Sequence, residues 1–172
     1  MPALSRMAAI MTIGILGAAF APGQEKSQDL AIVKYDGLVR EIQKHRGKVV
    51  VVDFWRTDCI PCRKAFPKFI DMQKRYADKG MVLIAVSIDP NDKDSLVRVN
   101  KFMEENPGVM RHLLLDEPQD VMVKKFQYEA LPFYYLFDRQ GKWVRFRASD
   151  SPDSKVDYAK LESVLVKMLD EK

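Results

Sequence analysis

The sequence predicts one α/β domain in which helices cover both faces of a central mixed sheet. Two stretches rich in β-branched residues, 49–55 and 81–88, have the length and composition of strands buried on both faces. An amphipathic helical pattern over 60–76 lies between them and completes a strand–helix–strand unit. A hairpin pattern over 133–146 and a helical pattern from Tyr158 onward add an antiparallel part and a covering helix.

The other elements follow from periodicity and from residues that break helices. Apolar residues recur at helical spacing from Tyr35 to Ile42, which predicts a helix ending near Gly47. Another helix is expected over 96–103, and the Asn-Pro-Gly sequence that follows it ends the helix. A short strand over 112–115 and a short helix over 121–126 precede the hairpin.

The N-terminus has the composition of an export signal. A start with a single basic residue is followed by an apolar run over 8–21 that ends in small residues, which predicts a secretory signal peptide over 1–21 with cleavage near 19–21. The run is short for a membrane-spanning helix, and an uncleaved anchor is the alternative. Residues 22–29 are expected to form a flexible leader, and residues 30–172 the folded domain.

Composition excludes several classes of function. The net charge of +4 over 172 residues is spread among both signs without a long basic block, so no nucleic-acid surface is expected. Two cysteines are too few for a disulfide-stapled miniprotein. No glycine-rich dinucleotide motif is present, and we expect neither a nicotinamide nor a flavin cofactor. We expect a monomer.

The strongest chemical signal is Cys59-Ile60-Pro61-Cys62, which follows a buried strand and begins a helix. A cysteine at a helix N-terminus faces unpaired backbone N–H groups, and these favour its thiolate. The second cysteine lies within reach on the same turn. Such a pair can attack a partner disulfide and then resolve the mixed disulfide.

Two other interpretations of the cysteines are weaker. A zinc site usually needs four ligands, and the only histidines, His45 and His112, are not at ligand spacing from the pair. No metal is therefore expected. A purely structural disulfide between residues three apart closes a very small loop and stabilises little.

The segment from Phe54 to Lys64 resembles the active-site signature of the thioredoxin superfamily, in particular its exported branch related to the TlpA and ResA disulfide reductases. The resemblance covers roughly residues 47–141. It implies a thioredoxin-like fold, and it identifies residues 86–115 as the extra strand–helix insertion of the exported branch, after the active-site helix.

The resemblance also assigns roles along the motif. Cys59 is implied as the attacking cysteine and Cys62 as the resolving one. Asp53, six residues before Cys59, matches a buried carboxylate that helps to take the proton from the resolving cysteine. Burial on a Val-rich strand raises the pKa of a carboxyl group and suits this role, whereas the alternative is an aspartate that points to solvent. Pro67 matches a proline that kinks the active-site helix.

A second set of residues is implied in substrate binding. Leu131-Pro132, before the strand at 133, matches the family's cis-proline segment, which helps to bind the substrate backbone. Ile60 and Pro61 lie between the cysteines, and Trp55 matches a tryptophan beside the active site. For Trp55, plain core packing is the alternative.

These residues together predict a thiol–disulfide oxidoreductase that reduces disulfide-containing exported proteins in the periplasm or another extracytoplasmic space. The resemblance implies a membrane electron donor. Without a histidine between the cysteines, we expect a reduction potential of about −180 to −270 mV. One rival is a thiol peroxidase, although Arg56 and Val52 stand where that pattern requires a hydroxyl residue and a proline. The other is a binding module with an inert disulfide.

Overall fold

The structure is a computed structural model that describes residues 29–108, 110–127, 129–150 and 155–171. The expected signal peptide over 1–21 and all but the last residue of the expected leader lie outside this described part. Within it, no helix combines the length and the apolar character needed to cross a membrane.

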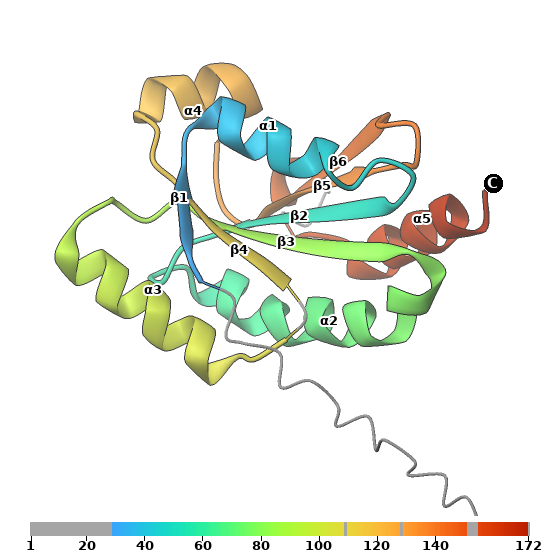
Figure 1. Ribbon diagram of the computed structural model, residues 1–172, viewed down its shortest axis with the longest axis horizontal. Coiled ribbons are helices and arrows are strands. Elements are labelled where there is room, and N and C mark those ends of the chain that lie inside the picture. The colour runs from blue at the N-terminus through green and yellow to red at the C-terminus, as the bar shows by residue number, and fades with distance from the viewer. Residues whose placement is uncertain (1–28, 109, 128, 151–154, 172) are drawn as a thin grey trace, which may run out of the picture.

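In the described residues the sheet has six strands in the order β1-β4-β3-β2-β5-β6 (Figure 1). The strands β1 to β4 pair in parallel, and β5 and β6 add an antiparallel edge beside β2. The strands are β1 Ala31–Val33, β2 Val49–Trp55, β3 Met81–Ser87, β4 Met110–Leu115, β5 Phe133–Phe137 and β6 Trp143–Arg147. The mixed sheet confirms the predicted fold class.

Helices cover both faces of this sheet. Helices α1 and α4 lie on one face, and α2, α3 and α5 lie on the other (Figure 1). The helices are α1 Tyr35–Gln43, α2 Ile60–Tyr76, α3 Lys93–Glu105, α4 Gln119–Phe126 and α5 Tyr158–Asp170. The extra strand–helix stretch expected over 86–115 is occupied by α3 and β4.

Strand β2 shows how the sequence builds two separate cores. All seven of its residues are buried, and successive side chains point to opposite faces of the sheet. Val49, Val51 and Trp55 join the core beneath α2, α3 and α5. Val50, Val52 and Phe54 join the core beneath α1 and α4. The continuous apolar run of β2 therefore reflects burial on both faces rather than on one.

Some boundaries differ from expectation, and one strand was not predicted. β1 pairs with β4, with Ala31 opposite Leu113, at the edge of the sheet. Three residues are too few to show an alternating pattern, and this is why the strand escaped prediction. The hairpin's second strand begins at Trp143, one residue later than expected, and the central strand β2 and helix α2 have the predicted bounds.

Candidate active site

Cys59 and Cys62 form a disulfide at the N-terminus of α2, with a Cα–Cα distance of 5.3 Å. Cys59 is the N-cap residue in an extended conformation, and its Sγ accepts a hydrogen bond from the backbone N–H of Cys62 at 3.2 Å. When the disulfide is reduced, the same N–H group and the helix dipole favour a thiolate at Cys59.

The two sulfurs differ in their access to solvent. Cys62 is 1% exposed and packs within the core beneath α2, whereas Cys59 is partly exposed at the rim of that core. A partner disulfide can therefore reach Cys59 and not Cys62. This difference agrees with the attacking and resolving roles that the resemblance implies.

The charges around Cys59 leave the thiolate favoured. Asp58, whose carboxylate opposes a neighbouring thiolate, is paired with the guanidinium of Arg56 at 3.0 Å. The first turn of α2 holds no acidic residue. Arg63 and Lys64 are exposed on the next residues of the helix and add positive charge.

Asp53 is a buried acid on the same face of β2 as Trp55, the face that α2 covers. It is 1% exposed, and among the described residues its Oδ1 has no hydrogen-bond partner. Burial raises the pKa of its carboxyl group to about 8. The alternative in which Asp53 points to solvent is therefore wrong.

Two tyrosines lie on the same side of the sheet as Asp53. Tyr134 is its register partner on β5, and the Tyr134 and Tyr158 hydroxyl groups are 3.1 Å apart. Burial and the negative charge of Asp53 both raise the pKa of Tyr134. The neighbours of the acid thus remain neutral hydroxyl groups at any physiological pH.

The Leu131–Pro132 peptide bond is cis, as the motif predicts. Pro132 directly precedes β5, whose first residue, Phe133, is the register partner of Phe54. The proline therefore lies at the end of β2 from which the chain turns toward Cys59. Phe54 and Phe133 stack at a centroid distance of 4.4 Å and fix this corner of the sheet.

The remaining predicted contact residues divide into surface and core. The side chain of Ile60 is 64% exposed, and Pro61 beside it is exposed as well, so both offer apolar surface next to Cys59. Trp55 is 1% exposed and packs against Phe102 and Phe66 at centroid distances of 4.5 and 5.6 Å. Its burial favours the core-packing alternative, in which Trp55 supports the site from within.

One feature of the site was missed by sequence reasoning. The buried carboxylate of Asp89, after β3, accepts hydrogen bonds from the Thr57 backbone N–H at 3.0 Å and the Thr57 hydroxyl at 2.6 Å. It also accepts one from the Ser87 hydroxyl at 2.8 Å. These bonds tie the loop before Cys59 to the neighbouring strand. The signal in the sequence is an aspartate directly after a buried strand that pairs with β2.

The histidines stand apart from the cysteines in the described structure. His112 lies on β4, where burial, with help from the charge of Arg111, lowers its pKa to about 4 and keeps it neutral. His45 follows α1 and lies 3.7 Å from Glu41. Among the described residues, no three His, Cys, Asp or Glu side chains gather as metal ligands.

The mixed sheet, the disulfide between Cys59 and Cys62 at a helix N-terminus and the cis-proline at the neighbouring strand end define a thioredoxin-like protein. Comparison with known families agrees with this class. The chain belongs to the AhpC/TSA family, whose model matches residues 24–146.

Individual relatives point to thiol–disulfide chemistry. The chain is 30% identical over 122 residues to the thiol-disulfide oxidoreductase ResA of Bacillus subtilis, covering 70% of this chain and 65% of that protein. It is 27% identical over 114 residues to ResA of Geobacillus thermodenitrificans, covering 66% and 62%. The matched region thus spans less than two thirds of each relative.

Solved structures resemble the chain in fold. A Chlorobium tepidum protein described as a thiol:disulfide interchange protein DsbE aligns with a TM-score of 0.55 and 28% identity, covering 74% of this chain and 84% of that one. The thioredoxin domain of a Bacteroides vulgatus thiol-disulfide oxidoreductase aligns with a TM-score of 0.55 and 25% identity, covering 72% and 84%.

Proposed function

We propose that the protein is a thiol–disulfide oxidoreductase that reduces disulfides of exported proteins through Cys59 and Cys62. The observation that carries this proposal is the pairing of a partly exposed Cys59 with a buried Cys62 at the N-terminus of α2. The similarity to ResA and DsbE proteins supports it.

The proposed reaction has two exchange steps. In the dithiol form, the Cys59 thiolate attacks one sulfur of the substrate disulfide, and the other substrate sulfur leaves as a thiolate that takes a proton from solvent. Cys62 then loses its proton and attacks the Sγ of Cys59, which releases the second substrate thiol. Two electrons pass to the substrate, and the protein is left with the disulfide that the structure contains.

Asp53 is the proposed acceptor of the Cys62 proton. Cys62 is enclosed in the core, and Asp53 is the acid on the sheet face that this core covers. A carboxyl group with a pKa of about 8 exchanges protons with a thiol near neutral pH at little cost in free energy. An exposed carboxylate of ordinary pKa would accept the proton far less readily.

Ile60, Pro61, Leu131 and Pro132 are proposed to hold an extended segment of the substrate beside Cys59. Ile60 and Pro61 are exposed next to the reactive sulfur. At the adjoining corner of the sheet Leu131 is partly exposed, and Pro132 is buried beside it. Trp55 is buried beneath these residues and supports them by packing in the core. This arrangement suits protein substrates better than small thiols, because a chain segment can contact both edges.

The setting of the reaction belongs to the same proposal. The apolar run over 8–21 supports export, with residues 30–172 as the working domain in the periplasm or an equivalent space. Each cycle leaves the pair oxidised, so a second dithiol must reduce it, and a membrane protein is the natural donor outside the cytoplasm.

Trapping tests the proposed roles directly. The Cys62→Ser variant should hold a disulfide-bonded protein substrate as a covalent complex on a non-reducing gel, because no sulfur remains to resolve it. The Cys59→Ser variant should trap far less, since its remaining sulfur is buried. Equal trapping by both variants would contradict the assignment of the attacking cysteine.

Turnover assays separate this function from its rivals. The parent protein should accelerate the reduction of insulin disulfides by dithiothreitol. Consumption of hydrogen peroxide faster than reduction of insulin would favour the thiol peroxidase. A pair that dithiothreitol does not reduce would leave a binding module with an inert disulfide.

A further inference from the structure

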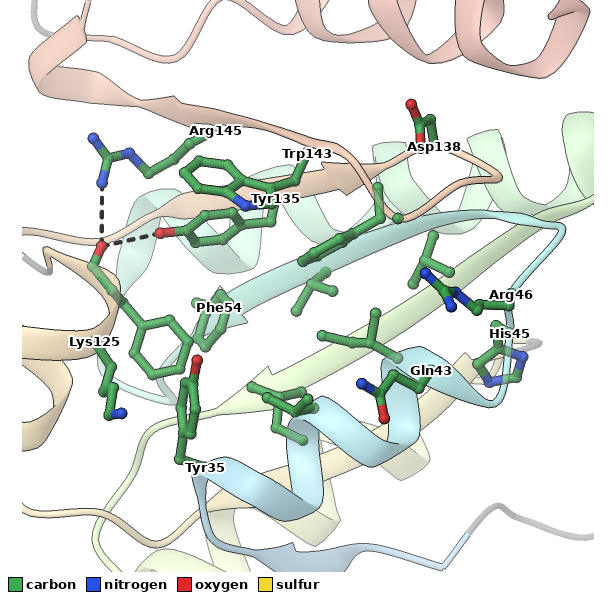
Figure 2. Close-up of a pocket in the computed structure, with 18 of the residues that line it drawn as sticks. Tyr35, Gln43, His45, Arg46, Phe54, Lys125, Tyr135, Asp138, Trp143 and Arg145 are labelled. Atoms are coloured by element: carbon green, nitrogen blue, oxygen red, sulfur yellow. Dashed lines mark hydrogen bonds between the residues drawn. The ribbon is translucent and has the colours of Figure 1, made fainter.

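A groove of about 430 Å³ lies on the sheet face opposite α2, between α1, α4 and the β5–β6 hairpin (Figure 2). Its volume falls within the range of about 300–1,000 Å³ that is typical of small-molecule sites. We call it the α1–β6 groove. Its lining includes none of the cysteines, nor Leu131 or Pro132.

The floor and one wall of the α1–β6 groove are apolar and aromatic. Leu38, Val52 and Phe54 are buried beneath it. Trp143 forms a wall, is 56% exposed, and meets the Tyr135 ring edge-on at a centroid distance of 5.2 Å. Figure 2 shows these rings lining the space between the hairpin and α1. A ligand here would bury apolar surface along its length.

The rim of the groove is basic, and its charges are not matched by acids. Among the described residues, five lysine and arginine side chains of the lining have no carboxylate oxygen within 4 Å. They are Arg46, Lys48, Lys124, Lys125 and Arg145. Basic side chains elsewhere in the described part of the chain, such as Lys68 and Lys93, also lack a carboxylate partner. The groove differs in that five such cations line one apolar hollow.

The basic side chains occupy both ends of the groove. In Figure 2, Lys125 lies beside Tyr35 at one end, where its Nζ is 4.6 Å from the ring centroid. Arg46 lies at the other end, near His45. The one acid of the lining, Asp138, points away from the apolar floor, and its Oδ1 accepts the backbone N–H groups of Gln140 and Lys142. It does not neutralise the rim.

We propose that the α1–β6 groove binds one small organic anion with an elongated apolar body, such as a medium-chain carboxylate. The apolar floor takes the body of the ligand, and the cations at an end of the groove hold its charged group. A neutral apolar ligand would leave the five cations unmatched, and a cation would be repelled by them. This binding function is separate from the proposed disulfide chemistry.

Isothermal titration calorimetry with decanoate tests the proposal on the whole purified protein. At low ionic strength and below the micelle concentration, we expect one saturable site with a dissociation constant of about 1–100 µM, which suits a ligand of this size. Decyltrimethylammonium, which has the same chain and the opposite charge, should bind at least about tenfold more weakly.

Variants locate the site and the end that holds the charge. Trp143→Ala should weaken decanoate binding about tenfold through lost apolar contact. Two double variants remove the cations at one end of the groove each: Arg46→Gln with Lys48→Gln, and Lys124→Gln with Lys125→Gln. At least one of the two should weaken decanoate binding about fivefold. The control for Trp143→Ala is Val144→Ala, at the exposed neighbouring residue. The control for the double variants is Lys93→Gln with Lys101→Gln, which changes two lysines on α3 across the sheet. Both controls should bind as the parent does.

The outcomes are independent of the disulfide. The double variant Cys59→Ser with Cys62→Ser should bind decanoate with unchanged affinity, so a failure of the redox proposal leaves this one standing. The proposal is overturned by the absence of saturable binding up to 1 mM (about tenfold above the expected range). Equal affinity for the cationic analogue, binding only above the micelle concentration, or full binding by the Trp143 variant would overturn it as well.

Discussion

The two cysteines stand three residues apart yet have different environments, and this difference underlies the proposed chemistry. Cys59 is partly exposed at the N-terminus of α2, where backbone N–H groups favour its thiolate. Cys62 and Asp53 are both 1% exposed on one side of the sheet. In the proposed mechanism, Asp53 therefore takes up the proton of Cys62 within the core rather than from an exposed position.

Replacing Asp53 with Asn should change stability in a pH-dependent way. The pKa of the carboxyl group rises from 3.8 when unfolded to about 8 when folded, so the folded protein binds the proton more tightly between these values. The parent protein then loses stability as pH rises from 4 to 8, whereas Asp53→Asn does not. At pH 8 we expect the variant to be more stable by roughly 5 kcal/mol in urea unfolding.

The matched control is Asp58→Asn, an exposed acid near the same site. Its stability should follow the parent's across the same pH range. In turnover, Asp53→Asn should reduce insulin disulfides about 100-fold more slowly because it removes the proton acceptor. A variant with parental stability at pH 8 and a parental rate would refute the buried-acid role.

Motif spacing predicted much of the site at this scale, because Cys59, Cys62, Asp53 and the cis-proline lie at characteristic distances along one chain. It could not decide whether Trp55 is a surface or a core residue. That depends on Phe102, which comes from α3 far along the sequence and covers the indole. Spacing within one segment carries no information about such a partner.

At the scale of elements, the loop before Cys59 is held by β3 rather than by its own sequence. Asp89 accepts two hydrogen bonds from Thr57 and one from Ser87, and the Ile88 backbone N–H donates to the Trp55 carbonyl at 3.0 Å. The end of β2 and the start of α2 are thereby fixed relative to each other. The position of Cys59 depends on this anchoring.

Thr57→Val tests the anchor with little change in side-chain shape. The variant loses the 2.6 Å hydrogen bond to the Asp89 carboxylate and leaves a buried acceptor short of one donor. We expect it to unfold in urea with about 1–3 kcal/mol less stability. Thr57→Ser keeps the hydroxyl group and should retain most of the stability. A loss of equal size in both variants would assign the effect to packing instead.

A second anchor joins elements at the other end of the sheet. Arg139, in the β5–β6 turn, donates to the carbonyl groups of Gly47, Lys79, Leu169 and Glu171 at 2.8 to 3.1 Å. One guanidinium group thus connects the start of β2, the end of the turn after α2, and the C-terminus of α5.

The variant Arg139→Lys tests how much the hydrogen bonds of the planar guanidinium group contribute to stability. An ammonium group cannot reach all four carbonyl oxygens, so we expect about 1–3 kcal/mol less stability and a Tm lower by several degrees. Lys142→Arg in the same turn is the control and should have little effect. Unchanged thermal unfolding of the Arg139 variant would mean that solvent replaces these bonds without cost.

Long periodic segments were predictable at this scale, and short or anchoring ones were not. β2 and α2 have strong patterns because they are buried along their whole length or along one face. β1 has three residues and gains its structure from β4. Arg139 looks like any turn residue until four separate carbonyl groups converge on it.

The whole molecule separates two chemical environments with one sheet. The core beneath α2, α3 and α5 contains Cys62 and encloses the buried acid, and the core beneath α1 and α4 carries the α1–β6 groove. The order of strands and helices in the sequence predicted this layered arrangement. The groove was not predictable, because its walls come from three distant segments and its rim from basic side chains that lack a carboxylate partner among the described residues.

The proposed function requires Cys59 and Cys62 to be a redox-active pair, and their reduction potential shows whether they are. The purified protein is equilibrated in glutathione or dithiothreitol buffers, and its dithiol and disulfide forms are counted after thiol trapping. We predict reversible exchange with a midpoint of about −180 to −270 mV. A midpoint near about −120 mV would instead indicate an oxidant of new disulfides, and a pair that does not exchange at all would contradict the proposed function.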